Sequence, residues 1–204
     1  MIGIIDYGLG NIKAFLNVYD RLSIPAKVIK VKNDFEDVSK LILPGVGAFD
    51  HAMTKLNNSG LRDKLEMLVC SEKMPVLGIC VGMQMLSNSS DEGDLPGLGW
   101  IDGKVEKFNI NDIPYKTKLP HMGWNNVSLK NDNPLMKGLS ENSKFYFLHS
   151  YFLCCADRDI ILAEVNYGSL ITSLVRQRNI FGIQQHPEKS HDAGIKFLKN
   201  FWSI

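Results

Sequence analysis

The sequence lacks the features that mark membrane and nucleic-acid-binding proteins. No apolar run approaches the ~20 residues of a membrane-spanning helix. The first residues, MIGIIDYGLGNIK, contain no basic segment followed by a long apolar one, so we expect no secretory signal. The net charge is only +1 over 204 residues, which offers no basic surface to a phosphate backbone. We therefore expect no membrane and no nucleic acid among the partners.

Cysteine is also scarce, and its spacing excludes several kinds of site. No pair among Cys70, Cys80, Cys154 and Cys155 has C-x-x-C spacing, and an adjacent pair is poorly placed for a disulfide. No Cys/His spacing suits zinc, and there is no G-x-x-x-x-G-K-[ST] phosphate loop. We expect a reducing, cytoplasmic location and no metal or other cofactor.

The composition that remains is typical of a globular protein. The chain is 45% hydrophobic and 22% charged. A chain of this length can bury roughly 70% of its unfolded surface. Because the sequence contains no internal repeat, low-complexity segment or linker, we expect a single domain over residues 1–204.

The first half alternates short apolar runs with amphipathic segments. Strands are expected at residues 2–6, 26–31, 40–44 and 75–79. Helices are expected at residues 11–22, 49–58 and 61–72, and a further helix opens at 81–90. This alternation predicts an α/β fold with a doubly wound, mostly parallel sheet, helices on both faces and right-handed crossovers.

The second half is dominated by strand-like segments. They lie at residues 103–108, 144–153, 160–168, 170–177 and 180–185. A hairpin is expected around Arg178-Asn179, so we predict antiparallel strands added to the parallel core. Residues 109–120 indicate a polar surface loop, and residues 190–202 a final helix with Ser190 as its N-cap.

Cys80 lies in LGICVGMQ, directly after a predicted strand. With Gly78 and Gly82 it forms G-x-C-x-G, the cysteine counterpart of the serine nucleophile elbow. Open α/β sheets bind ligands at this carboxyl edge, and the N-terminus of the following helix favours a thiolate. Taken alone, however, a buried cysteine in a tight turn explains the pattern better.

A second motif, HPEKS at residues 186–190, supplies the groups that a cysteine nucleophile needs. His186 ends a strand-like run and can act as the base, and Glu188 can orient it. Pro187 restricts the backbone between them. Alone, the motif fits a surface histidine beside the start of a helix. Combined with the elbow, it predicts a triad of Cys80, His186 and Glu188.

A third motif, PGVGAF at residues 44–49, follows another predicted strand. Its glycines let backbone N–H groups come close to a ligand, as an acyl-transfer site requires for its oxyanion. The N–H of Val81 is one candidate donor, and the turn at 45–47 offers a second. On its own this motif is more simply an ordinary turn from strand to helix.

Together these motifs resemble the class I (triad) glutamine amidotransferases over nearly the whole chain. The elbow sequence and HPEKS are specific for that superfamily. IDYGLGN at 5–11 and PHMGWN at 120–125 narrow the resemblance to the glutaminase subunits of imidazole glycerol phosphate synthase. LPGVGAF, PGLGW at 96–100 and FYFLHSYF at 145–152 extend it.

The resemblance implies a glutaminase cycle. Cys80 would attack the side-chain amide of glutamine, His186 would move the proton, and Glu188 would orient His186. Val46, whose peptide turns in the family, and Val81 would form the oxyanion hole. The residues implied to hold glutamine are Gly47, Gln84, Ser150 and Tyr151.

The resemblance also implies a partner. Ammonia would pass to a (β/α)8 cyclase subunit of a heterodimer, which makes imidazole glycerol phosphate and AICAR in histidine biosynthesis. Asn11, Tyr146 and Lys189 match residues that face this subunit. Glutaminase activity would stay low until the cyclase binds its own ligand.

The chain departs from the family pattern at a few positions. Gln185 stands where a large aromatic residue is usual, and Trp100 and the Cys154-Cys155 pair are also unusual. These departures leave open a paralogous subunit that supplies ammonia for the amidation of a surface sugar. From other classes, a cysteine peptidase or γ-glutamyl hydrolase and a non-enzymatic flavodoxin-like binding module also remain alternatives.

Overall fold

A mixed sheet of eight strands forms the centre of the computed structural model, which describes residues 1–130 and 133–204. Its parallel strands are β1 (Ile2–Ile5), β2 (Ala26–Ile29), β3 (Lys40–Gly45), β4 (Val76–Cys80) and β13 (Ile180–Ile183). Its antiparallel strands are β12 (Ser169–Gln177), β11 (Ile161–Tyr167) and β8 (Ser128–Leu129). The strand order, β2-β1-β3-β4-β13-β12-β11-β8, confirms a mostly parallel sheet with antiparallel additions.

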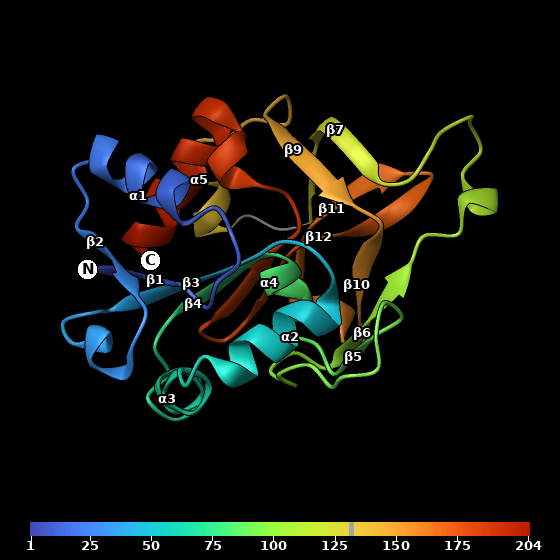
Figure 1. The fold of residues 1–204 in the computed structure, drawn as a ribbon. Coiled ribbons are helices and arrows are strands. Elements are labelled where there is room, and N and C mark those ends of the chain that lie inside the picture. The colour runs from blue at the N-terminus through green and yellow to red at the C-terminus, as the bar shows by residue number, and fades with distance from the viewer. Residues whose placement is uncertain (131–132) are drawn as a thin grey trace.

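Helices cover both faces of this sheet, as predicted. In Figure 1, α1 (Ile12–Arg21) and α5 (His191–Ser203) lie above it, and α2 (Phe49–Asn58) and α3 (Arg62–Glu66) lie below. The apolar stripe of α1 buries Phe15 and Tyr19, and each such aromatic contributes about 1.5–3 kcal/mol when fully buried. One-turn 3₁₀ segments lie at Lys32–Phe35, Ile110–Asp112, Pro134–Met136, Arg158–Ile160 and Pro187–Lys189.

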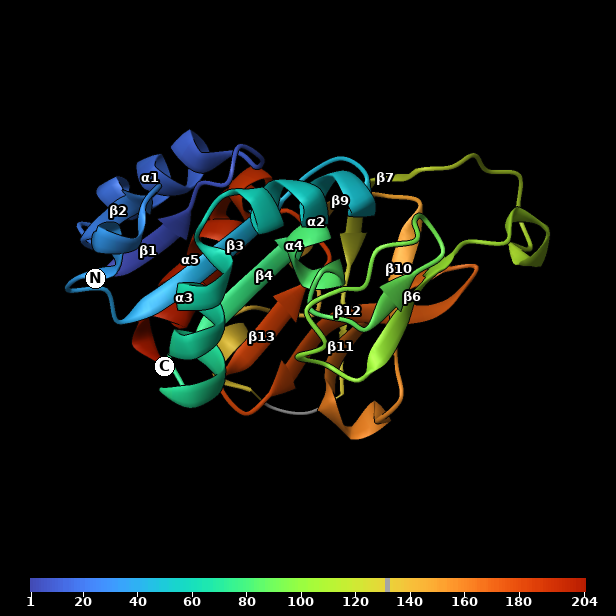
Figure 2. The same cartoon turned by 60° about the horizontal axis from the view of Figure 1, so that its bottom comes forward.

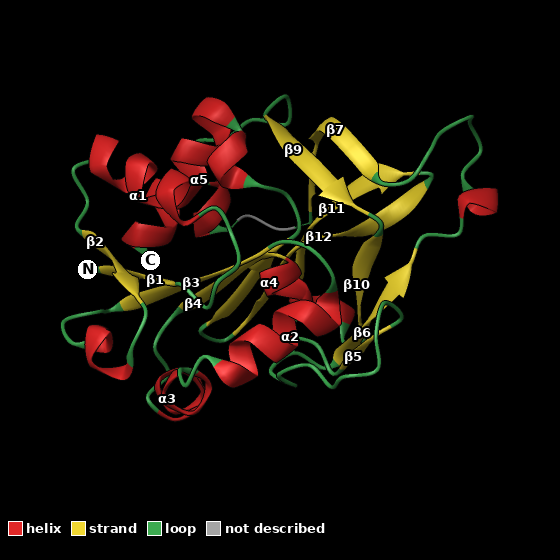
Figure 3. Cartoon of the chain, viewed as in Figure 1, coloured by secondary structure: helices red, strands yellow, loops and turns green. Residues whose placement is uncertain are grey.

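Two smaller sheets stand beside the main one, on the right in Figure 3. The first has the order β10-β6-β5 and consists of β10 (Tyr151–Cys155), β6 (Gly103–Lys107) and β5 (Ser89–Ser90). The second is an antiparallel ribbon of β7 (His121–Asn126) and β9 (Lys144–His149). A bridge between Tyr146 and His186 ties this ribbon to the end of the main sheet.

The single strand predicted over 144–153 is wrong, because the chain changes sheet at Ser150. β9 pairs with β7, whereas β10 pairs with β6. Phe145, Phe147 and His149 are buried before the break and Leu153 after it, so the alternation of side chains continues in phase. A period-two pattern carries no information on which strand is the neighbour, and the break is therefore invisible in the sequence.

Other predicted boundaries also change. The helix expected over 81–90 stops after four residues as α4 (Val81–Gln84), because Ser89 and Ser90 pair with β6. The helix expected over 61–72 is α3 followed by a π-helical turn, Met67–Ser71. Ser190 does precede α5, but its side chain makes no capping bond to that helix.

The polar segment 109–120 is a surface loop, as predicted, and it projects from the rest of the molecule in Figures 1 and 2. The hairpin around Arg178-Asn179 also forms, with Arg178 at a φ of +57°. The sequence analysis missed β7 and β8. None of the helices within the described residues is both long enough and apolar enough to cross a membrane.

Candidate active site

Cys80 ends β4, and α4 begins at the next residue, so the chain turns sharply at the cysteine; Figure 2 shows α4 directly beyond the tip of β4. Its φ of +55° is a strained value for a residue with a side chain. A Cβ on Gly78 would lie 2.6 Å from the carbonyl oxygen of Gly82, and one on Gly82 only 1.9 Å from that of Leu43. Close packing of β4 against α4, and of α4 against β3, therefore requires glycine on both sides of the cysteine.

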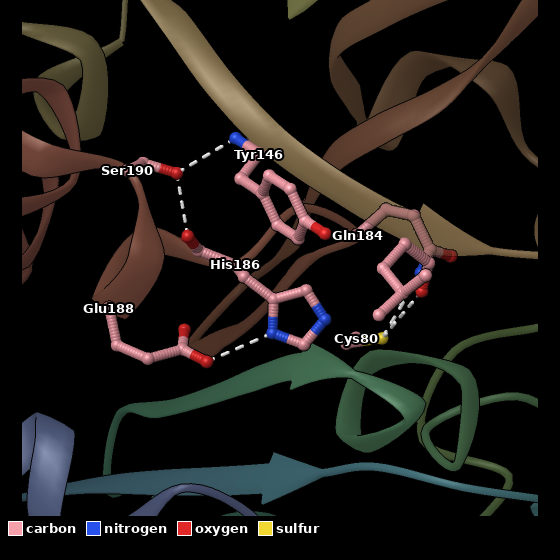
Figure 4. A network of polar contacts seen from close by, with 7 residues as sticks. Cys80, Tyr146, Gln184, His186, Glu188 and Ser190 are labelled. Carbon is pink, nitrogen blue, oxygen red and sulfur yellow. Dashed lines mark hydrogen bonds and ion pairs between the residues drawn. The ribbon is translucent and has the colours of Figure 1, made fainter. Parts of the chain in front are cut away.

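His186 lies at the same edge of the sheet as Cys80. It follows β13, which pairs with β4 in parallel, so both residues come just after neighbouring carboxyl ends. The 3₁₀ turn Pro187–Lys189 brings Glu188 back toward the imidazole (Figure 4). Nδ1 of His186 is 2.9 Å from Oε1 of Glu188, and both side chains are almost fully buried. The structure thus brings the three residues of the predicted triad together.

The charge of His186 is set by its two neighbours. Burial alone would lower the pKa of His186, but the interactions with Cys80 and Glu188 outweigh burial and raise this pKa to about 10. The imidazole is therefore held as a cation beside the sulfur. The N-terminus of α4, which we expected to add positive charge beside the sulfur, adds little of it, because α4 is a single turn.

The β7–β9 ribbon fixes the backbone of His186. The backbone N–H of His186 donates to the carbonyl oxygen of Tyr146 at 2.8 Å. Ser190 Oγ donates to the carbonyl oxygen of His186 at 2.6 Å and accepts the N–H of Tyr146 at 3.0 Å (Figure 4). The side chain of Ser190 therefore joins the base to β9 instead of capping α5.

Two buried glutamines connect the sulfur to the wall of the site. Nε2 of Gln184 lies 3.8 Å from Sγ of Cys80. Gln84 donates from Nε2 to Oε1 of Gln184 at 3.2 Å and to the carbonyl oxygen of Tyr151 at 3.0 Å. Sγ itself is 3.9 Å from the carbonyl oxygen of Leu148. These contacts place the thiol against a hydrogen-bonded set of polar groups.

Cys80 opens into a cavity of about 290 Å³. Predicted catalytic, oxyanion-hole and glutamine-binding residues gather on its walls: Val46, Gly47, Cys80, Val81, Gln84, Ser150, Tyr151 and His186. Gly47 has a φ of +89°. Glu188 is not on the wall, because it lies behind His186. The cavity suits a small polar ligand that presents an electrophilic carbon to the sulfur.

The three residues predicted to face a partner lie in different settings. Lys189 lines the cavity, and its Nζ is 5.6 Å from the centre of the Tyr146 ring. Asn11 is exposed in front of α1 and does not line the cavity. The preceding residue, Gly10, lies against Pro44 of β3, where a Cβ would come within 2.7 Å.

Sequence reasoning missed some residues of the site. Glu92 lines the cavity, and its Oε2 accepts the N–H of Phe49 at 2.8 Å, which anchors the start of α2. No motif signals it. Tyr7 donates to the carbonyl oxygen of Pro44 at 2.7 Å. Burial, followed by the negative charge of Cys80, raises the pKa of Tyr7. Its place within IDYGLGN was an available signal.

Gln185 is fully buried beside the site. Its Oε1 accepts a hydrogen bond from Oγ of Ser173 at 2.7 Å. Its Nε2 is buried and has no hydrogen-bond partner within residues 1–130 and 133–204. A polar side chain therefore supports the strand end next to His186, in place of the aromatic residue that the resemblance implied.

Comparison with known proteins shows which proteins the chain is similar to. Residues 3–204 match the family model "Glutamine amidotransferase class-I". The protein named imidazole glycerol phosphate synthase subunit HisH is 56% identical in Bdellovibrio bacteriovorus and 49% identical in Leptospira interrogans, each covering 100% of both chains. The fold is shared with a crystal structure of a glutamine amidotransferase (TM-score 0.75, 20% identity, 98% of both chains). It is also shared with PurLQS from Thermotoga maritima (TM-score 0.73, 14% identity, 99% of this chain and 97% of that one).

Proposed function

The chain belongs to the class I glutamine amidotransferases, and we propose that it is the glutaminase subunit of an imidazole glycerol phosphate synthase. It hydrolyses glutamine to glutamate and passes the ammonia to a (β/α)8 cyclase subunit in histidine biosynthesis. The observation that carries this proposal is the buried set of Cys80, His186 and Glu188 at the wall of a small cavity. The full-length relatives named above supply the pathway.

The reaction follows from the geometry of the three residues. The Cys80 thiolate attacks the side-chain amide carbon of glutamine, and His186 gives its proton to the departing nitrogen, which leaves as ammonia. Water then attacks the γ-glutamyl thioester, and its proton passes to His186 as glutamate and the thiolate are released. Glu188 holds the imidazole with its Nε2 available to the sulfur, because Nδ1 is engaged at 2.9 Å.

The cavity wall supplies the remaining functions. Backbone N–H groups of Val46 and Val81 stabilise the oxyanion of each tetrahedral intermediate. Both residues flank the sulfur, one directly after β3 and one at the start of α4. The glutamine itself is held by Gly47, Gln84, Ser150 and Tyr151, all of which line the cavity.

We propose that the partner binds on the face around the cavity mouth. Lys189 lines the cavity and packs over Tyr146, which supports an interface that senses the site directly. Asn11 extends the interface to the start of α1. We infer a heterodimer of one single-domain glutaminase chain, residues 1–204, with one cyclase chain in the cytoplasm.

Reconstitution tests the proposal. The chain is mixed with the histidine-pathway cyclase of its host, and glutamate release is measured with and without the cyclase ligand. We expect hydrolysis that depends on the cyclase and disappears in Cys80→Ala but persists in Cys70→Ala, since Cys70 lies away from the site on an exposed helical turn. Co-purification with a sugar-modifying relative of the cyclase would move the proposal to the paralogous function. Full hydrolysis by Cys80→Ala would refute it.

A further inference from the structure

Two buried histidines outside the triad lie side by side at the cavity, with His149 on its wall and His121 behind it. His121 of β7 and His149 of β9 are opposite each other in the ribbon, with Nδ1 of His121 3.0 Å from Nε2 of His149. Their exposed fractions are 1% and 5%. A buried imidazole pair needs a hydrogen-bond partner at every ring nitrogen, so the outer two nitrogens indicate what the pair contacts.

Each outer nitrogen has one polar partner. Nδ1 of His149 is 2.8 Å from the carbonyl oxygen of Tyr151, and Nε2 of His121 is 2.6 Å from Nδ2 of Asn125. A carbonyl oxygen can only accept, so Nδ1 of His149 carries the proton. Its Nε2 then accepts from Nδ1–H of His121, and Nε2 of His121 accepts from the amide of Asn125. The hydrogen bonds all run in one direction.

The surroundings keep both rings neutral, which this direction requires. His121 is stacked between Phe147 and Tyr167, at 4.9 and 4.1 Å between ring centres. Burial lowers the pKa of His121 to about 4 and, with smaller contributions from the neighbouring His121 and His186, lowers that of His149 to about 3. At neutral pH each ring therefore has one proton and one lone pair.

The chain of hydrogen bonds ends on the segment that lines the cavity. The carbonyl oxygen of Tyr151 receives His149 from one side and Nε2 of Gln84 at 3.0 Å from the other. Ser150 and Tyr151 are the first residues after the chain leaves β9, and both lie on the cavity wall. Two donors on one carbonyl fix the backbone at this change of sheet.

We propose that His121 and His149 are positioning residues that set the Ser150–Tyr151 segment for the amino-acid substrate. Asn125 selects the Nδ1–H tautomer of both rings. This inference rests on the proposed glutaminase function, because that function supplies the substrate. The pair takes no part in proton transfer to the reacting atoms, and its removal therefore affects binding of the substrate more than the reactivity of Cys80.

The variant Asn125→Asp tests the direction of the chain without changing its volume. A carboxylate only accepts, so it draws a proton onto Nε2 of His121. His121 then keeps its proton on Nδ1 and becomes a cation, or it loses that proton. In the second case His149 must donate from Nε2 to His121, and its Nδ1 then faces the carbonyl oxygen of Tyr151 with a lone pair. The matched control is Asn126→Asp, because that side chain bonds to the carbonyl oxygen of Glu141 instead of the histidines.

Two measurements are made on the full chain with its cyclase partner. Imidazole nitrogen chemical shifts report the tautomers. The rate of inactivation by a glutamine-analogue electrophile, measured against its concentration, gives a half-saturating concentration that reports binding and a maximal rate that reports the reactivity of Cys80. We expect Nδ1–H tautomers in the wild type. In Asn125→Asp we expect protonated Nε2 in His121 and a half-saturating concentration about tenfold higher, with a maximal rate within about twofold. Asn126→Asp should match the wild type.

Several outcomes would overturn the inference. The wild type could carry Nε2–H tautomers and still be labelled by the analogue. That result would rule out the positioning role and leave the proposed function intact. Equal half-saturating concentrations in Asn125→Asp and the wild type, with a changed tautomer, would do the same. A wild type that the analogue does not label would remove the proposed function, and with it the substrate that the pair serves.

Discussion

Oε1 of Glu188 lies 2.9 Å from Nδ1 of His186, with both side chains within 3% of complete burial. This contact decides which nitrogen of the imidazole faces the sulfur. Because Pro187 restricts the backbone between the two residues and both side chains are buried, the carboxylate is held beside the base. The pair is therefore a single rigid unit next to Cys80.

Replacing the carboxylate should remove most of the activity. In Glu188→Gln the new amide donates to Nδ1 of His186, which puts the imidazole proton on Nε2, facing the sulfur. We expect kcat for glutamine hydrolysis to fall by about 10²–10⁴-fold. Steady-state assays with the cyclase partner measure it. Glu66→Gln, the same change at a half-buried helix position away from the cavity, is the control, and an unaltered kcat in Glu188→Gln would contradict the assignment.

The four thiols should differ in reactivity toward iodoacetamide. Burial raises the pKa values of Cys70, Cys154 and Cys155, to about 12 and 11 for the last two, so these thiols remain protonated at neutral pH. Cys80 faces an imidazolium and the cavity. We expect mass spectrometry to find Cys80 alkylated first, and more slowly in Glu188→Gln. Equal rates at Cys70 and Cys80 would favour a non-enzymatic binding module.

The histidine pair should make the fold sensitive to acid. The unfolded chain protonates each imidazole below about pH 6.5, whereas the folded chain holds His121 and His149 neutral down to about 4 and 3. The free energy of unfolding therefore falls as the pH drops from about 6.5 toward 4, by up to about 1.4 kcal/mol per pH unit for each group.

Urea denaturation at pH 7 and pH 5 measures this dependence. His121→Phe removes one of the two titrating groups, so its loss of stability between the two pH values should be smaller than that of the wild type. Carboxylates contribute equally to both proteins and cancel in the comparison. The same loss in both proteins would show that His121 is protonated in the folded chain.

The turn that carries Cys80 should not tolerate a methyl group at Gly82. A Cβ there would lie 1.9 Å from the carbonyl oxygen of Leu43, so β3 and α4 would have to separate. We expect Gly82→Ala to cost about 3 kcal/mol or more in the free energy of unfolding. Gly60→Ala is the matched control, since Gly60 has open space and only its φ of +74° opposes alanine, at about 1–2 kcal/mol. Equal losses in urea denaturation would show that the elbow is not tightly packed.

The parallel half of the fold could be predicted because each of its elements has a recognisable pattern in its own stretch of sequence. Short apolar runs bounded by turns predicted β1, β3 and β4, and a helical stripe predicted α1 and α2. The meeting of Cys80 and His186 depends on more than local signals. The two residues meet because β4 and β13 are neighbours, and the sequence indicated this meeting through the elbow and the HPEKS motif, and not through any local signal of strand pairing.

Features that depend on tertiary pairing could not be predicted. The change of sheet at Ser150 keeps the side-chain alternation intact and is therefore silent. Glu92 reaches the site through a loop that carries no motif. His121 and His149 are far apart in sequence, and their contact exists only once β7 and β9 are paired. Hydrogen bonds that close between distant segments leave no periodic signal along the chain.

The bridge from Tyr146 to His186 has a mechanical consequence. The ribbon of β7 and β9 contacts the backbone of His186 near the middle of β9, and the end of β9 leads to Ser150 and Tyr151 on the cavity wall, whereas Cys80 ends β4 of the main sheet. A displacement of the ribbon would therefore reach the base and the cavity wall without passing through β4, the strand that carries the sulfur. Such a displacement would change the distance between the imidazole and the sulfur, and with it the turnover rate, with no change in any charge.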